Sequence, residues 1–189
     1  MDTRDTVFIA IFAAFTAALA VFPPITLPVI GVPITAQSLG AIVAGGVLGA
    51  KRGSLSLVLF LVLVAAGLPL LSGGRGGFAV FMGPTGGFLI GWILTAFFVG
   101  LLVEQLWSYL NFFTALVASA VGGIVVLYAI GIPWSATVAG IPLSTALAGS
   151  LPFIPGDILK SVIAASVIVI TKNSYPIISP KERTLPGFR

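Results

Sequence analysis

The sequence predicts an all-α integral membrane protein with six membrane-spanning helices and both termini in the cytoplasm. Three observations predict this fold class. Hydrophobic residues make up 58% of the 189 residues and charged residues only 7%, whereas an ordinary soluble domain carries roughly 25% charged residues. The apolar residues fall into six segments of about the length that a spanning helix needs. The cationic residues concentrate on one side of these segments.

The six predicted spans form one transmembrane domain, residues 1–189, and are residues 6–22, 34–50, 54–68, 83–106, 112–130 and 155–171. The third is short, but Lys51-Arg52 and Pro69 bound it. Segments rich in proline and glycine separate the spans, as is typical of connecting loops. A further apolar segment, 134–151, contains Pro142 and two glycines. We therefore expect a re-entrant or interfacial segment there and not a seventh span.

The distribution of the nine cations favours this topology. With the N-terminus in the cytoplasm, only Arg75 and Lys160 lie on the outer side of the membrane. This distribution of cations agrees with the positive-inside rule, and we expect the chain to lie in the cytoplasmic membrane. The net charge of +4 then needs no nucleic-acid partner, whereas Arg75 and Lys160 need another explanation. The seven cytoplasmic cations are Arg4, Lys51, Arg52, Lys172, Lys181, Arg183 and Arg189.

The residues that the sequence lacks exclude several kinds of chemistry. Histidine and cysteine are both absent, which excludes Ser–His and Cys–His catalysis, thiolate or imidazole metal ligands and disulfides. The segment 49–53, Gly-Ala-Lys-Arg-Gly, lacks the spacing of a phosphate-binding P-loop. We therefore predict that the chain is not an enzyme and has neither a metal site nor a cofactor.

Asp157 and Lys160 are the most informative polar residues, because ionisable groups near a membrane core are costly. They lie three residues apart in the first turn of the last predicted span, so they share one helix face. One interpretation is a capping aspartate with a lysine that extends to the headgroups. The other is a pocket wall, in which Asp157 accepts from ligand N–H groups and Lys160 meets a carboxylate.

Arg75 lies among four glycines, of which Gly74 and Gly76 are its direct neighbours. Glycines allow close approach of a ligand to the backbone, and an arginine can bind a carboxylate with two hydrogen bonds. The alternative is a flexible outer loop with an unused cation.

The summed charge of Arg75, Asp157 and Lys160 is +1, which suits a monoanion with an apolar body and N–H donors. Four further candidate contacts have sequence positions near the outer ends of the spans: Gln37, Phe78, Thr85 and Phe88. Packing or contact with the membrane interface also explains the aromatic residues.

The first predicted span carries a different signal. Ala10, Ala14 and Ala18 are spaced four residues apart, and small residues at this spacing form a smooth face on which another helix can pack. The face suits either a partner subunit or a neighbouring helix of the same chain.

Three motifs together resemble the BioY family of biotin transporters. They are Gly73-Gly74-Arg75-Gly76-Gly77, Gly83-Pro84-Thr85-Gly86-Gly87-Phe88-Leu89 and Pro155-Gly156-Asp157-Ile158-Leu159-Lys160. The resemblance covers nearly the whole chain, about residues 2–172. Members are the substrate-binding S components of energy-coupling factor (ECF) importers. The family's glycine motif usually continues into tyrosine, where this chain has Phe88.

The resemblance implies high-affinity binding of biotin for uptake across the membrane. It implies as partners a transmembrane coupling subunit, which would meet the alanine face, and two ATP-binding cassette ATPases. It also makes Arg75, Asp157 and Lys160 the expected polar contacts, without deciding which cation meets the biotin carboxylate. The alternatives are an S component for another vitamin and a membrane assembly subunit that transports nothing. Homo-oligomerisation stays open.

Overall fold

The computed structural model describes residues 2–26 and 31–178 and is almost entirely helical. Its longer helices are α1 (Thr3–Ala18), α2 (Gln37–Leu48), α3 (Ala50–Ala65), α5 (Gly86–Gln105), α6 (Phe112–Ala120), α7 (Leu127–Ala139), α8 (Leu143–Ser150) and α9 (Ile154–Ser174). The short elements are η1 (Leu19–Val21), α4 (Ala79–Met82), η2 (Trp107–Tyr109), the π-helix η3 (Val121–Val126) and η4 (Leu151–Phe153). Strands β1 (Ile25–Thr26) and β2 (Pro33–Ile34) pair antiparallel. Three predicted cytoplasmic cations, Lys181, Arg183 and Arg189, lie outside the described residues.

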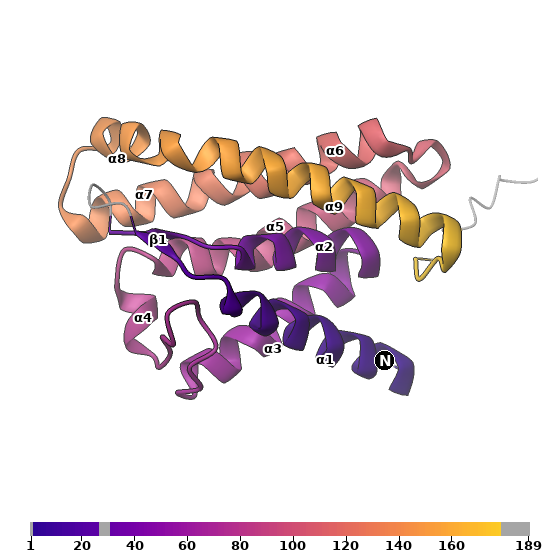
Figure 1. The fold of residues 1–189 in the computed structure, drawn as a ribbon, viewed down its shortest axis with the longest axis horizontal. Coiled ribbons are helices and arrows are strands. Elements are labelled where there is room, and N and C mark those ends of the chain that lie inside the picture. Colours follow the sequence, from indigo (N-terminus) through magenta and orange to yellow (C-terminus); the bar gives the residue numbers. More distant parts are fainter. Residues whose placement is uncertain (1, 27–30, 179–189) are drawn as a thin grey trace, which may run out of the picture.

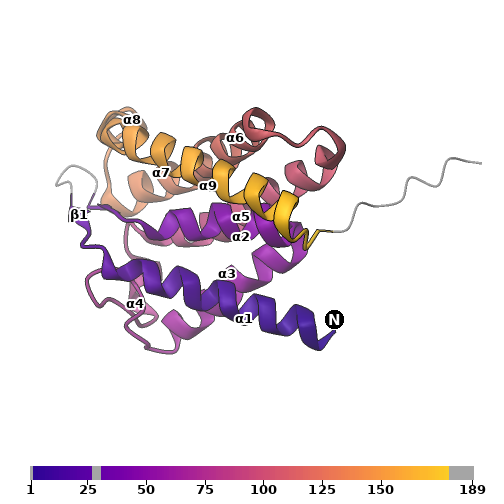
Figure 2. The same ribbon diagram turned by 45° about the vertical axis from the view of Figure 1, so that its right-hand side comes forward.

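Helices α2 and α5 lie at the centre of the bundle (Figures 1 and 2). Helix α5 packs against α2, α3 and α7, and α2 also packs against α3 and α9. Helices α1 and α3 cover one side of this central pair, and α6, α7 and α9 cover the other (Figure 2). The burial of the side chains agrees with this arrangement. Helix α2 is buried almost all round, whereas outer helices such as α1 expose apolar side chains.

Four helical stretches of the described chain are long and apolar enough to cross a membrane. They are Thr3–Val21, Gly86–Gln105, Phe112–Ala139 and Leu143–Ser174. Helix α2 is apolar but has only 12 residues, and α3 has 16. A sharp joint at Gly49, with a φ of 87°, connects these two shorter helices where the sequence predicted spans 34–50 and 54–68.

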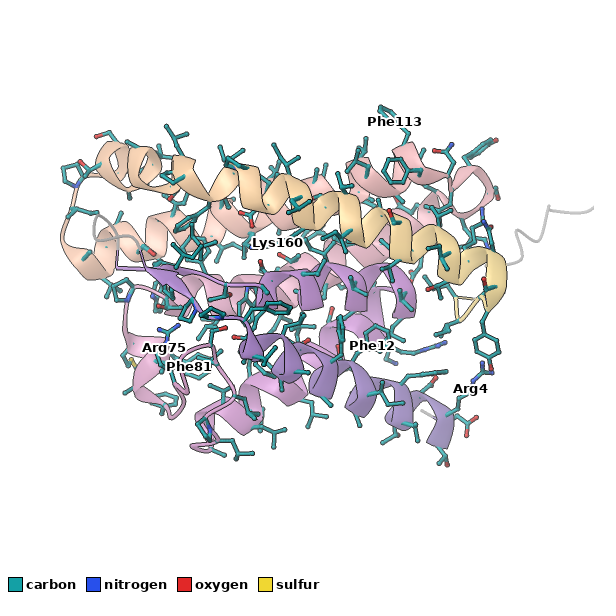
Figure 3. All side chains as sticks on the ribbon, viewed as in Figure 1. Arg4, Phe12, Arg75, Phe81, Phe113 and Lys160 are labelled. Carbon is teal, nitrogen blue, oxygen red and sulfur yellow. The ribbon has the colours of Figure 1, made fainter. Side chains whose placement is uncertain are left out.

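The two ends of the described chain lie at the same end of the bundle (Figure 1). There the guanidinium of Arg4 donates a hydrogen bond of 2.9 Å to the Tyr175 hydroxyl, and Arg52 pairs with Asp5 at 3.2 Å. Arg75 lies at the opposite end, beside α4 (Figure 3). The molecule therefore has one end that holds the first and last described residues and another that holds the glycine-rich loop.

The segment 134–151, predicted to be re-entrant or interfacial and not a seventh span, contains the end of α7, a turn and the whole of α8. Its place relative to the membrane stays a prediction. Trp134 to Ala139 continue α7, and the chain turns at Gly140, whose φ is 65°. Helix α8 then runs through η4 into α9, so that Leu143–Ser174 is one stretch of 32 residues. Pro142 precedes this stretch as its N-cap. Pro152 and Pro155 are the second residues of η4 and α9, and proline is tolerated in the first turn of a helix.

Helix α1 turns one face to the bundle and the other away from it. Ile9, Ala13 and Thr16 are buried, whereas Ala10, Ala14 and Ala18 are exposed. The predicted alanine face is thus unoccupied by the described part of this chain.

Close packing of the central helices depends on a few glycines, of which Gly45 on α2 is the clearest. A β-carbon at Gly45 would overlap with the backbone carbonyl of Ala96 on α5. At this contact the backbones of two central helices touch, so neither side can move without shifting a whole helix.

We expect Gly45→Ala to lower the free energy of unfolding by about 1–3 kcal/mol, the usual cost of overpacking. Thermal unfolding of the purified protein in detergent measures the effect. Gly156→Ala is the matched control, because a β-carbon there meets nothing within 4 Å. Equal unfolding temperatures for the two variants would contradict the interpretation of the α2–α5 contact.

Candidate substrate-binding site

A cavity lies between α2, α5, α7, α9 and the loop that follows α3. Its polar lining residues are Thr35, Gln37, Ser38, Arg75, Thr85, Tyr128, Asp157 and Lys160. The rest of the lining is apolar or aromatic: Val32, Pro33, Ile34, Leu71, Phe88, Leu89, Trp92, Leu127 and Phe153. An apolar cavity with a few polar groups is the usual form of a small-molecule site.

Asp157 and Lys160 form an ion pair in the wall of this cavity. The Lys160 ammonium lies 2.9 Å from Oδ1 of Asp157 and donates a second hydrogen bond, also of 2.9 Å, to the Ser38 hydroxyl on α2. The Tyr128 hydroxyl on α7 donates to Oδ2 of Asp157 at 2.6 Å. Figure 3 shows Lys160 between α9 and α2. Three helices therefore hold this pair.

The pair retains hydrogen-bonding capacity for a ligand. The side chains of Asp157 and Lys160 are only 7% and 13% exposed, so each charge needs partners. Lys160 has three N–H donors and uses two of them on Asp157 and Ser38. Asp157 accepts one bond on each oxygen, which leaves a lone pair on each. The pair can thus accept from two ligand N–H groups and donate to one ligand oxygen.

Arg75 brings a second cation to the cavity from the glycine-rich loop. The loop closes on itself, since the backbone N–H and carbonyl groups of Leu71 and Arg75 pair at 3.0 and 3.2 Å. The side chain donates from Nε to the Ser72 carbonyl at 3.3 Å. Within residues 2–26 and 31–178, Arg75 forms no ion pair with a carboxylate. Burial lowers its pKa from the usual value, but an arginine stays charged.

Aromatic side chains form the apolar part of the site. The ring of Phe88 makes edge-on contacts with Tyr128 and with Phe153, at centroid distances of 6.4 and 6.3 Å. Trp92, which also lines the cavity, packs against Phe60. Phe88, one of the predicted contacts, therefore lies between two other aromatic rings of the site, and the ring of Tyr128 also carries a hydroxyl.

The cavity brings together six of the nine predicted contacts: Gln37, Arg75, Thr85, Phe88, Asp157 and Lys160. The other three, Gly74, Gly76 and Phe78, do not line it. Gly74 has a φ of 69°, and a β-carbon at Gly76 would overlap with the Leu68 carbonyl. These two glycines therefore shape the loop that carries Arg75, while the Phe78 side chain is 62% exposed.

Gln37 lines the cavity, but the structure gives its amide a different task from the predicted ligand contact. All of its hydrogen-bonding capacity is used by protein groups. A bond to a ligand would therefore require one of these bonds to break.

Ser38 and Tyr128 were not among the predicted contacts. A signal for Tyr128 was present, because it is the one strongly polar side chain in the apolar segment 121–134, and polar groups within spans tend to face a cavity. Ser38 gave no such signal, since small hydroxyl residues commonly bond to their own helix.

The sequence model of the BioY family matches residues 1–177. The chain belongs to the BioY family. Among curated relatives, the biotin transporter BioY of Rhizobium etli is 51% identical over 186 residues, which cover 94% of this chain and 98% of the relative. The biotin transporter BioY of Rhodobacter capsulatus is 47% identical, with 87% and 90% covered. A solved structure, the S-component for biotin from an ECF-type ABC transporter, is similar with a TM-score of 0.88 and 34% identity, covering 94% of this chain and 97% of that one.

Membership in the BioY family confirms the resemblance seen in the three sequence motifs. The match to the S-component structure also confirms an all-helical membrane fold of S-component type. Together with the long apolar helices, it makes the chain a multi-pass membrane protein.

Proposed function

We propose that this chain binds biotin with high affinity as the substrate-specific subunit of an ECF-type importer and has no enzymatic activity. One observation carries the proposal. A hydrogen-bonded Asp157–Lys160 pair lies in an aromatic cavity, and Arg75, with no carboxylate partner among the described residues, lies in the same lining. The names of the relatives, which are biotin transporters, support the same substrate.

The chemistry of biotin fits this arrangement group by group. Biotin is a monoanion with an apolar ring and chain, and its ureido group has two N–H donors and one carbonyl acceptor. Asp157 has two lone pairs left for the N–H groups, and Lys160 has one N–H left for the carbonyl. The Lys160 charge is already paired, so we assign the biotin carboxylate to Arg75. The aromatic wall of Phe88, Trp92 and Phe153 suits the apolar ring system.

Equilibrium binding of radiolabelled biotin to the purified chain in detergent tests the proposal. We expect saturable binding in the submicromolar range, displaced by unlabelled biotin. Thiamine and riboflavin in excess serve as competitors, because an S component for another vitamin is the nearest alternative. Displacement by either vitamin and not by biotin, or the absence of binding to a folded chain, would overturn the biotin assignment.

We further propose six spans, with both termini and the Arg4–Tyr175 contact on the cytoplasmic side of the cytoplasmic membrane. On this assignment, α2 and α3 are the two short spans, and the loop with Arg75 faces outward. The position of the two described ends at one end of the bundle supports an even number of spans. Membrane lipid then covers the exposed apolar faces, and we expect no nucleic-acid partner.

We propose that the exposed alanines of α1, Ala10, Ala14 and Ala18, contact the transmembrane coupling subunit, which works with two ATP-binding cassette ATPases. A smooth surface of small residues allows two helices to approach closely.

Ala14→Trp should abolish ATP-driven biotin uptake in cells that supply the coupling subunit and both ATPases, because the indole separates the two helices. Biotin binding to the purified variant should stay within about twofold of wild type, since distant sites act independently. Ala129→Trp, at an exposed alanine of α7, is the matched control and should leave uptake intact. Undiminished uptake by Ala14→Trp would argue against this docking face.

Tyr128→Phe should weaken biotin binding about 10–100-fold, because it removes a hydrogen bond to a charged acceptor, typically about 1.5–3 kcal/mol. The ring and its contact with Phe88 stay in place, so the unfolding temperature should change little. Tyr109→Phe, at a side chain that is 77% exposed, provides the control. Wild-type affinity in Tyr128→Phe would mean that Lys160 alone orients Asp157.

A further inference from the structure

Gln37, the first residue of α2, is fully buried and joins three segments of the chain. Its amide nitrogen donates to the Thr16 carbonyl on α1 at 3.1 Å and to the Leu70 carbonyl at 2.9 Å. Its amide oxygen accepts from the backbone N–H of Ser72 at 2.8 Å and from the Ser72 hydroxyl at 3.1 Å. The amide therefore uses both donors and both lone pairs.

Three of these four bonds hold the loop that follows α3. Leu70 and Ser72 lie on either side of Leu71, which is 2% exposed and pairs with Arg75 through the backbone. Without Gln37, the Leu70 carbonyl and the Ser72 N–H would lose their only described partner on α2. The tight turn from Leu71 to Arg75 thus has its base fixed to the bundle by one side chain.

The same turn determines where the Arg75 guanidinium lies. Nε of Arg75 donates to the Ser72 carbonyl, so the residue that Gln37 holds is the residue that orients Arg75. A continuous series of bonds therefore runs from α2 through Gln37 and Ser72 to the cation in the cavity lining. Figure 3 shows Arg75 on this loop, at the end of the bundle.

We propose that Gln37 is a positioning residue for the substrate carboxylate, acting through Ser72 to hold Arg75 toward the cavity. The inference rests on the proposed function, in which Arg75 meets the carboxylate of biotin. It assigns Gln37 to selectivity for the charged end of the substrate, whereas Asp157, Lys160 and Tyr128 serve the ureido end. If Gln37 had only a structural role, its substitution would weaken the contacts to both ends of the ligand alike.

A positioning role and a merely structural role of Gln37 predict different results when biotin is compared with its primary amide, in which an uncharged carboxamide replaces the carboxylate. The measured quantity is the affinity for biotin divided by the affinity for the amide. We expect Arg75→Ala to lower this ratio about tenfold or more, since it removes a charge-assisted contact. Gln37→Met, which keeps the side-chain length, should lower the ratio about fivefold and leave the affinity for the amide within about twofold.

A double variant tests whether Gln37 acts through Arg75. In the Arg75→Ala background, Gln37→Met should change the ratio by less than about twofold, because residues that act in series are not additive. Ser72→Ala removes only the hydroxyl bond, so it serves where Gln37→Met does not fold, and it should lower the ratio about twofold to threefold. Ser56→Ala, a fully buried serine bonded within α3, is the control and should leave the ratio unchanged. Equal losses for both ligands in Gln37→Met, or full additivity with Arg75→Ala, would overturn the proposal.

A measurement without ligand keeps this inference separate from the biotin assignment. The chain has no cysteine, so a single cysteine in Leu71→Cys reports on the turn alone. We expect maleimide to label this cysteine at least about tenfold faster after Gln37→Met, because exposure of a buried site depends on local opening. An unchanged labelling rate would overturn the anchoring role. Faster labelling with no binding of biotin by wild type would instead locate the failure in the proposed substrate.

Discussion

Asp157→Asn is expected to weaken biotin binding by at least about 100-fold, because it removes the charged acceptor of the two ligand N–H groups, and hydrogen bonds to charged groups contribute about 1.5–3 kcal/mol each. Asparagine keeps the shape of aspartate but offers one acceptor oxygen and an NH₂ group. The NH₂ group would face either the Tyr128 hydroxyl or the Lys160 ammonium, both of which donate to Asp157 in the structure. The Lys160 charge would also lose its carboxylate partner.

Equilibrium binding of labelled biotin measures this loss, and thermal unfolding establishes that the variant is folded. Asp5→Asn is the matched control, because it makes the same chemical change in an ion pair with Arg52 that is partly exposed. Such exposed pairs contribute little, so Asp5→Asn should bind biotin as wild type does. If Asp157→Asn retains wild-type affinity, the carboxylate does not accept from the ligand.

Lys160→Met is expected to have an effect of similar size, about 100-fold weaker binding, since it removes the N–H group assigned to the ligand carbonyl and the bond that orients the Asp157 carboxylate. Methionine fills nearly the same volume as the lysine stem, so loss of packing contributes little. The Ser38 hydroxyl would also lose its donor. The same binding measurement applies to this variant.

Lys172→Met provides the control on the same helix. Lys172 lies near the end of α9 and donates to the Leu110 carbonyl at 2.9 Å, far along the helix from Lys160. Lys172→Met should leave the affinity for biotin unchanged within about twofold. Equal losses in the two lysine variants would indicate a general effect of charge and would contradict the local role of Lys160.

Much of the fold could be predicted from composition and hydropathy, because a chain with so few charges must place its helices in lipid. The course of the helices at 134–151 could not be predicted in this way. Proline usually ends a helix, but Pro133 lies inside α7, where Trp134 and Ser135 fix the helix by donating to the Gly83 and Pro84 carbonyls. Such tertiary support is invisible in a local pattern.

The site was predicted best where the residues carry charge. Asp157, Lys160 and Arg75 all line the cavity, because an ionisable group in this setting has few other places to lie. Neutral polar residues were harder. Gln37 was expected to bind a ligand, yet its partners come from Thr16, Leu70 and Ser72, and no spacing rule brings these together.

The direction of the Tyr128 side chain depends on the number of residues in the π-helix η3. This wide turn, Val121–Val126, is held by the Thr95 hydroxyl, which donates to the Gly122 carbonyl at 3.0 Å. A π-turn accommodates one residue more than an α-turn, and each residue rotates an α-helix by about 100°. Tyr128 follows two residues later. A chain with one residue fewer here would therefore keep the same helix and the same tyrosine yet turn its hydroxyl away from Asp157, so insertions and deletions at this turn alter the site more than most substitutions do.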